Sequence, residues 1–441
     1  MITVEFDGLV LGRVASGVER YTQCLANYFA AHGEDTRVRI FTLTPSAHLD
    51  SRVEQLAVTG PEDLARAWLA KRTKGGQDIY HLPYFPLDTV QLLPLALAPR
   101  SVLMVHDLTF FHFPYLSDVE RERRLRRFEL TLKWATAIVT NSEFTRRDVL
   151  NEFDVPEEKV EVIYLGVQDH FLKPLDRAVL QSARKRLRLP DKFVLTVGRD
   201  YPHKNLYAVV EAFCGLARGG FSECGLVMAG ETLDAEETRR ITQLVRDRGL
   251  EGKIIRTGFV DDAELAALYQ LAEVFVFPSL HEGFGFPAVE AMVSGTPVIA
   301  VKRTSIPEVC GDAALLVDEG TADEFARALR GLLEDANLRA SLVDKGRKRA
   351  ARFSWDAAAR ETHRVYDRIL DERFRTKYTL EERERCWEEF HLLSYGEIAD
   401  ARQRLEAVED LIKASKTVLP RDLYEEFESC GRGDVRPPST P

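Results

Sequence analysis

Cysteine is scarce in this 441-residue chain, and the few cysteines are scattered along it. They form no C-x-x-C pair and show no spacing with histidine that suits zinc. The sequence therefore argues against a disulfide framework and against a zinc module, and we expect reduced thiols, several of them in hydrophobic cores. The six cysteines are Cys24, Cys214, Cys224, Cys310, Cys386 and Cys430.

Long apolar runs and an excess of positive charge are also missing. No stretch approaches the roughly 18 apolar residues of a membrane-spanning helix. The start, MITVEFDGL, lacks the basic region and the long apolar run of a signal peptide, so we predict a cytoplasmic protein. The net charge of −10, from 70 acidic against 60 basic residues, disfavours general attraction to nucleic acid.

The chain has instead a repeated alternation of short apolar runs with helical patterns. Its length suggests two or three domains, and 45% hydrophobic residues support sizeable cores. A charged segment short of apolar residues, from about 170 to 190, separates two halves of this kind. We expect strands at Ile2–Phe6, Arg37–Leu43, Ser101–Val105, Ala137–Thr140 and Val160–Tyr164, and then at Phe193–Val197, Gly225–Gly230, Ile254–Val260 and Val274–Phe277.

The most informative stretch is Val274–Ala300, VFVFPSLHEGFGFPAVEAMVSGTPVIA. A buried strand is followed by a glycine-bearing turn and by a helix with Pro287 in its first turn. The backbone N–H groups of Gly283, Phe284, Gly285 and Phe286, together with the positive helix end, offer a place for a phosphate. Two carboxylates, Glu282 and Glu290, would repel a phosphate, so we assign them to hydroxyl groups of the same ligand. The pattern indicates a sugar joined through phosphate to a nucleoside.

Two cations follow another predicted strand. Arg199 and Lys204 come directly after Phe193–Val197, in Gly198-Arg199-Asp200-Tyr201-Pro202-His203-Lys204-Asn205. Two positive charges five residues apart after a strand suit a diphosphate better than a hydrophobic core, although surface ion pairs are the alternative interpretation. No Asp-x-Asp follows a strand where it would bridge a metal to the diphosphate. We therefore expect no metal and no cofactor, with the two cations and the helix end in the place of the metal.

These motifs resemble those of glycosyltransferase family 4, the "glycosyl transferases group 1" type of retaining glycosyltransferases with the GT-B fold. Glu282 and Glu290 match its E-x7-E element within HEGFGFPAVEAM, and Arg199 and Lys204 match its G-R-x4-K-N element. The resemblance covers about 350 residues. It implies two Rossmann-like domains facing a cleft, at 1–180 for the acceptor and 190–353 for the nucleotide sugar. A crossover helix at 354–370 and a helical extension at 371–441 with a disordered end complete the predicted organisation.

The resemblance also implies roles for individual residues. Arg199 and Lys204 would hold the diphosphate, Glu282 the hexose hydroxyls and Glu290 the ribose hydroxyls. His106 would lie near the transferred sugar and the acceptor, with Asp107 orienting it. The remaining predicted donor-site residues are backbone contacts at Gly283, Phe284, Gly285, Phe286, Gly258, Val260 and Gly17. Gly17 is equally compatible with a plain turn glycine, because Ser16-Gly17 stands where the family often has paired glycines.

The resemblance further implies a hexosyltransferase that acts on a glycan or a lipid-linked sugar. The segment His106-Asp107-Leu108 followed by FFHFP is similar to mannosyltransferases of bacterial surface polysaccharides, so GDP-mannose is the first donor to consider, ahead of UDP-linked sugars. Two alternatives from other classes stay open: a nucleotide-sugar epimerase of the same fold, and a non-catalytic scaffold of a glycan-assembly complex. A third, dinucleotide binding, rests on the G-x-G-x-x-A match from Gly283 and on Glu308 downstream.

Three further segments have two interpretations each. His81 and Tyr84 either face the crevice or pack their loop. The basic amphipathic segment 120–134 either contacts anionic lipid at the inner membrane face or is a solvated helix with Arg–Glu pairs. Segment 380–415 keeps a three–four apolar spacing for about two heptads, too short to indicate a coiled coil, and either packs on the enzyme or mediates self-association.

Overall fold

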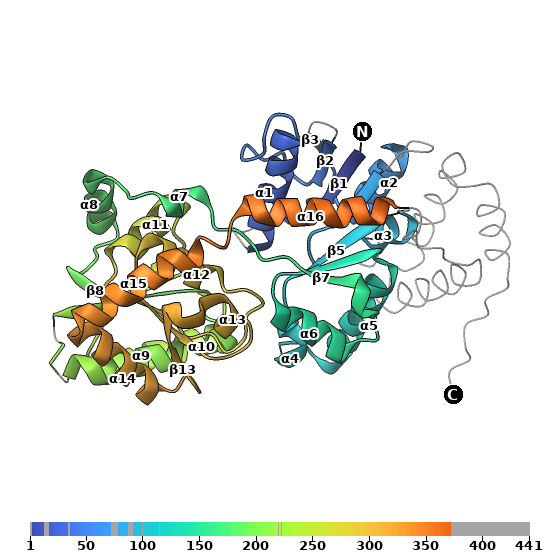
Figure 1. Ribbon diagram of the computed structural model, residues 1–441. Coiled ribbons are helices and arrows are strands. Elements are labelled where there is room, and N and C mark those ends of the chain that lie inside the picture. The colour runs from blue at the N-terminus through green and yellow to red at the C-terminus, as the bar shows by residue number, and fades with distance from the viewer. Residues whose placement is uncertain are drawn as a thin grey trace, which may run out of the picture.

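The structure, a computed structural model, describes residues 2–12, 17–33, 36–71, 78–86, 91–98, 100–113, 115–218, 220–221 and 223–371. Its strands form two separate sheets in which every recorded strand pair is parallel, each sheet with its own helices (Figure 1). The predicted pair of α/β domains is therefore confirmed. The predicted extension beyond Asp371, with the segment 380–415, lies outside the described residues.

The first sheet has the order β3-β2-β1-β4-β5-β6-β7 in the part of the chain that the structure describes. Its strands are β1 (Ile2–Asp7), β2 (Thr36–Thr42), β3 (Glu54–Ala57), β4 (Asp78–Leu82), β5 (Ser101–Val105), β6 (Ala137–Thr140) and β7 (Val160–Val162). The connecting helices are α1 (Gly17–His32), α2 (Pro61–Lys71), α3 (Leu92–Leu97), α4 (Thr109–His112), α5 (Asp118–Trp134) and α6 (Glu143–Glu152).

The second sheet has the order β10-β9-β8-β11-β12-β13. Its strands are β8 (Lys192–Val197), β9 (Cys224–Ala229), β10 (Ile254–Gly258), β11 (Val274–Phe277), β12 (Val298–Val301) and β13 (Ala314–Val317). Its helices are α9 (Leu206–Arg218), α10 (Ala235–Arg248), α11 (Asp262–Leu271), α12 (Phe286–Ser294), α13 (Ile306–Cys310), α14 (Ala322–Glu334) and α15 (Ala336–Ala350), and the short 3₁₀ turn η3 (Pro202–Lys204) precedes α9. Along the chain, α7 (Asp169–Leu172) and α8 (Arg177–Arg186) come after the last strand of the first sheet and before the first strand of the second. Both helices pack against α11.

Both strand orders have a switch point, where the chain reverses its direction of travel across the sheet. In the second domain the reversal lies between β8 and β11, which are neighbours in the sheet. A ligand crevice forms outside the carboxyl ends of parallel strands at such a point. The residues after β8, with Arg199, and those after β11, with Glu282, are therefore brought to one edge although about 80 positions separate them.

The last described helix, α16 (Trp355–Leu370), leaves the second domain and lies across the first (Figure 1). It corresponds to the predicted crossover helix and packs against α1. The Arg100 Nε donates to the carbonyl of Ile369 at 3.1 Å, and the Tyr366 hydroxyl lies 2.6 Å from Nδ1 of His81. The second domain is thus tied to the first by a helix that is anchored in the core.

Helix α5 contains the basic segment 120–134. The apolar side chains of this segment do not face outward, because Phe128 and Leu132 are buried in the first domain's core and Leu125 packs against it. The exposed face carries Arg123 and an Arg126–Glu122 ion pair. No described helix combines the length and the apolar character that crossing a bilayer requires.

His81 belongs to the core rather than to the crevice. Its side chain is fully buried in β4 between the hydroxyls of Tyr21 and Tyr366, and it does not line the cavity described below. Tyr84 likewise donates to Asp7 at 2.7 Å instead of facing the cavity. Burial, with a smaller contribution from His106, lowers the pKa of His81 to about 3.

This buried histidine predicts a loss of stability in acid. Below pH 6.5 the unfolded chain binds a proton at His81, whereas the folded protein binds one only near pH 3, so stability falls as pH falls between these values. The loss at pH 5 is about 2 kcal/mol from this group. His81→Gln should flatten the dependence of the urea-unfolding midpoint on pH between 7 and 5. An unchanged dependence would show that His81 is not buried in its neutral form.

Candidate active site

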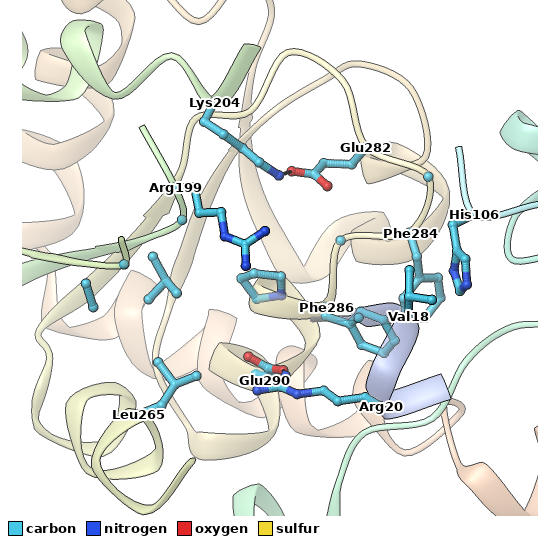
Figure 2. Close-up of a pocket in the computed structure, with 18 of the residues that line it drawn as sticks. Val18, Arg20, His106, Arg199, Lys204, Leu265, Glu282, Phe284, Phe286 and Glu290 are labelled. Carbon is cyan, nitrogen blue, oxygen red and sulfur yellow. Dashed lines mark hydrogen bonds and ion pairs between the residues drawn. The ribbon is translucent and has the colours of Figure 1, made fainter. Parts of the chain in front are cut away.

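A cavity of about 430 Å³ lies between the two domains at the carboxyl edges of their sheets (Figure 2). The first domain contributes residues of α1 and the segment after β5. The second contributes the segments after β8, β9, β10 and β11, with the start of α12. The cavity brings together the predicted residues Arg199, Lys204, Glu282, His106, Glu290, Gly283, Phe284, Gly285, Phe286, Val260 and Gly17. Gly258 is not among the lining residues, although Phe259 and Val260 beside it are.

Lys204 and Glu282 form an ion pair on one side of the cavity (Figure 2). Lys204 ends η3, and Glu282 lies in the loop after β11. The Glu282 backbone is fixed from a neighbouring turn: its N–H donates to the Thr304 hydroxyl at 3.2 Å, and its carbonyl accepts from the Ser305 hydroxyl at 2.9 Å. An entering phosphate would compete with Glu282 for the Lys204 ammonium group. The freed carboxylate could then accept hydrogen bonds from hydroxyl groups.

Arg199 lies between this ion pair and Glu290 in the view of Figure 2. Its Nε donates to Glu231 at 3.2 Å, and a third of its side chain is exposed to the cavity. Glu231 was not predicted from the sequence. It directly follows the predicted strand Gly225–Gly230, however, just as other residues of the cavity follow the ends of predicted strands. Arg199 and Lys204 are therefore each paired with a carboxylate.

The turn between β11 and α12 depends on its glycines. Gly285 has φ of 98°, a left-handed conformation that residues with a Cβ rarely adopt, and it stands at the N-cap position of α12 without supplying a side-chain hydrogen bond. A Cβ added at Gly283 would lie less than 3.0 Å from the carbonyl oxygen of His106 in the other domain. The backbones of the two domains thus meet at Gly283, and the uncapped start of α12 faces the cavity.

Glu290 is held by side chains that were not predicted from the sequence. It is 2% exposed, and its Oε1 accepts from Arg20 of α1 across the cleft, while Oε2 accepts from the Tyr269 hydroxyl at 3.0 Å. Arg20 also donates to Asp262 at 3.0 Å. Such partners offset the loss of hydration that burial of a carboxylate causes, and each oxygen keeps a lone pair for a ligand hydroxyl. Asp261 caps the start of α11.

His106 follows β5 on the first domain's side of the cavity (Figure 2). Burial lowers its pKa, so the ring is neutral at pH 7. Its Nε2 donates to the carbonyl of Pro83 at 2.9 Å, which leaves Nδ1 as an acceptor. The expectation that Asp107 orients this ring is wrong: the Asp107 carboxylate accepts from the backbone N–H of Thr109 at 2.9 Å, and a backbone carbonyl fixes the ring instead.

Two family models together match most of the described chain. The "Glycosyltransferase Family 4" model matches residues 15–171, and the "Glycosyl transferases group 1" model matches residues 180–349. O-antigen chain mannosyltransferase B of Escherichia coli is 30% identical over 302 residues, which are 68% of this chain and 76% of that protein. The chain belongs to glycosyltransferase family 4. A second relative, the serotype-specific mannosyltransferase WbdA of Escherichia coli, is 33% identical over 62% of this chain, but the match spans only 34% of WbdA.

Solved structures confirm the GT-B fold of this family 4 member. Sucrose-phosphate synthase from Thermosynechococcus elongatus superposes with a TM-score of 0.68 at 23% identity, over 84% of this chain and 99% of that one. HepE of Anabaena, in a complex with UDP-glucose, superposes with a TM-score of 0.66 at 18% identity, over 83% and 99% of the two chains. The resemblance predicted from the motifs is thus confirmed for family and for fold.

The dinucleotide interpretation is wrong. It required Glu308 to bind a ribose, but Glu308 does not line the cavity. Its carboxylate instead accepts from the backbone N–H groups of Glu143 and Phe144, at 2.7 and 3.1 Å, and from the Tyr164 hydroxyl at 2.8 Å. Glu308 therefore joins the second domain to the first, beside the start of α6.

Proposed function

We propose that this glycosyltransferase moves a hexose from a nucleotide sugar to a glycan or a lipid-linked sugar, with retention at the anomeric carbon and without a metal. The observation that carries the proposal is the meeting of Arg199, Lys204, Glu282 and Glu290 on one cavity, opposite His106. GDP-mannose is the first donor to test, because two relatives are mannosyltransferases, one of them of an O-antigen chain. The UDP-glucose complex of HepE supports a nucleotide-sugar donor.

In this proposal the diphosphate lies between Arg199, Lys204 and the start of α12. Glu290 accepts from the ribose hydroxyls, and Glu282, released from Lys204, accepts from the hexose hydroxyls. The negative charge that grows on the leaving diphosphate is stabilised by cations that are already in place, so no metal is needed for this step. Closure of the domains excludes water and limits hydrolysis of the donor.

The proposed chemistry uses no covalent intermediate on the enzyme. In the donor complex Glu282 is occupied by the hexose hydroxyls, and Glu290 is held by Arg20 and Tyr269, so neither carboxylate stands free as a nucleophile. The bond from the anomeric carbon to the diphosphate oxygen breaks, and the acceptor oxygen forms its bond on the same face. The acceptor proton passes to the diphosphate oxygen. His106, which is neutral, is a positioning group for sugar and acceptor in this scheme.

Calorimetry with GDP, UDP and NAD, with and without magnesium, tests the donor site. One nucleoside diphosphate should bind without added metal. Transfer from its hexose conjugates should then be measured, and NMR should determine the anomeric configuration of the product. Binding of neither diphosphate, or binding only with magnesium, would contradict the proposal.

An epimerase would convert the donor without an acceptor. A scaffold would bind no donor, and it would lose its role when residues after Asp371 are deleted, whereas an enzyme would lose only part of its activity.

Replacing Glu290 should act mainly on donor binding. Glu290→Gln removes the charge that strengthens its hydrogen bonds to ribose, so we expect the Kd for the nucleoside diphosphate to rise about tenfold to a hundredfold, with little change in kcat. Titration calorimetry and the donor KM measure this. Glu334→Gln is the control, because Glu334 is an exposed glutamate paired with Arg330 on α14. A Kd within twofold of the wild-type value would remove Glu290 from the donor site.

Contact with a membrane through α5 stays a proposal. The exposed arginines of that helix would supply electrostatic attraction to anionic lipid, since its apolar face is used by the core.

A further inference from the structure

Three side chains from distant parts of the sequence meet at the domain interface, outside the donor cavity. His112 ends α4 and Asp148 lies in α6, both in the first domain, whereas His281 lies in the loop after β11 of the second. One ligand-type atom from each lies within 4.8 Å of the other two. The His112 Nε2 is 2.9 Å from both carboxylate oxygens of Asp148, and the His281 Nε2 is 4.0 Å from Asp148 Oδ2.

The proton of His281 is fixed by a chain of hydrogen bonds that begins at Asp107. The Asp107 carboxylate accepts a hydrogen bond from the Thr109 hydroxyl. The Thr109 oxygen, 3.0 Å from Nδ1 of His281, must then accept from that nitrogen. In the neutral ring the proton is thus on Nδ1, and Nε2 carries a lone pair.

This lone pair has no hydrogen-bond partner. The His281 Nε2 is buried, its side chain is 6% exposed, and within the described residues no donor reaches it. It faces the Asp148 carboxylate, which is also an acceptor. Two acceptors that face one another across a buried gap of 4.0 Å repel unless a cation lies between them.

We propose that His112, Asp148 and His281 bind a divalent transition-metal ion of the zinc class, which links the two domains. Two imidazoles and one carboxylate are ligands that Zn²⁺ binds at about 2.0–2.2 Å, with a fourth position for water. Tetrahedral bonds of this length place ligand atoms about 3.4 Å apart, so the side chains need move by only about 1 Å. The Nδ1–H of His281 already donates to Thr109, as metal-bound histidines commonly do to a neighbouring acceptor.

Access and surroundings suit such a site. His112 is a third exposed and offers an entry path, whereas Asp148 is only 10% exposed. The rings of Phe113 and Phe144 lie 6.0 and 5.6 Å from that of His281, between centroids, and provide an apolar wall. Because His281 directly precedes Glu282, an ion held here would fix the loop of the E-x7-E element against the first domain. The ion would favour the closed arrangement and take no part in the chemistry.

The test uses the purified full-length chain without a histidine tag. Calorimetry with Zn²⁺ should show one site per chain, and Co²⁺ should give visible absorption of the intensity typical of four-coordinate cobalt. His112→Gln, Asp148→Asn and His281→Gln should each weaken binding of the metal at least tenfold. Small-angle scattering should show a smaller radius of gyration with Zn²⁺ in the wild type but not in these three variants. Neither the calorimetry nor the scattering needs the donor, so failure of the metal-site proposal can be distinguished from failure of the proposed function.

His363→Gln is the matched control. His363 and Asp367 form an exposed histidine–aspartate pair at 3.1 Å on α16, away from the interface, and its loss should leave Zn²⁺ binding unchanged. Because His112 is exposed, His112→Gln keeps the fold even where a buried variant does not. Loss of affinity in His363→Gln, equal affinity in His112→Gln and the wild type, or the absence of a one-to-one site would each overturn the proposal.

Discussion

Arg199→Ala is expected to lower kcat by about a hundredfold to a thousandfold, the usual effect of removing one group that stabilises developing charge. The negative charge on the diphosphate grows as the sugar leaves, so the guanidinium interacts more strongly with the transition state than with the bound donor. The donor KM should change less than kcat. Lys204→Ala should behave in the same way, with the further consequence that Glu282 loses its ion-pair partner.

Steady-state kinetics with the donor found by calorimetry measure this effect, and Arg330→Ala is the control. Arg199 and Arg330 are both partly exposed arginines of the second domain that pair with a glutamate, but Arg330 lies on α14 outside the cavity. Exposed ion pairs contribute about 0–1 kcal/mol, so neither variant should unfold the protein. Normal turnover in Arg199→Ala would remove Arg199 from the chemistry. Equal losses in both variants would indicate a general effect of charge.

The parts of the site that were predictable are those set by local sequence. Arg199 and Glu282 each follow a buried strand, and parallel strands place their carboxyl ends at one edge whatever the rest of the chain does. The turn at Gly283 and Gly285 and the helix that starts after it are also local features. For the same reason the two α/β domains could be predicted from alternating strands and helices, and the family resemblance then indicated how they face one another.

The contacts that were not predicted join segments that lie far apart. Arg20 and Glu290 are 270 positions apart, and nothing near Arg20 distinguishes it from a helix-surface arginine. His112, Asp148 and His281 have no sequence spacing that suggests a metal, because they come from three separate elements. Glu308 was given a ribose as its partner by motif, but packing of the domains gave it backbone and hydroxyl donors of the first domain. Such contacts depend on how the domains meet, which no local pattern encodes.

The closeness of the two domains at Gly283 leads to the strongest expected effect of a small substitution. Gly283→Ala would place a methyl group against the carbonyl oxygen of His106, closer than atoms can approach, so the domains must separate by about 1 Å or more. A displacement of this size at a reacting centre costs about a hundredfold in rate. We therefore expect turnover to fall by at least that factor, measured with the same donor and acceptor as for the wild type.

Gly252→Ala is the control for Gly283→Ala, because a Cβ added at Gly252 meets no atom within 4 Å. Each domain keeps its own core in Gly283→Ala, since the overlap is between domains. Binding of the nucleoside diphosphate, whose predicted contacts are mostly in the second domain, should therefore fall much less than turnover. Small-angle scattering should show a larger radius of gyration in this variant than in Gly252→Ala. Full turnover in Gly283→Ala would mean that the arrangement in which Gly283 touches His106 is not the one that reacts, and that the acceptor and donor meet in a more open cleft.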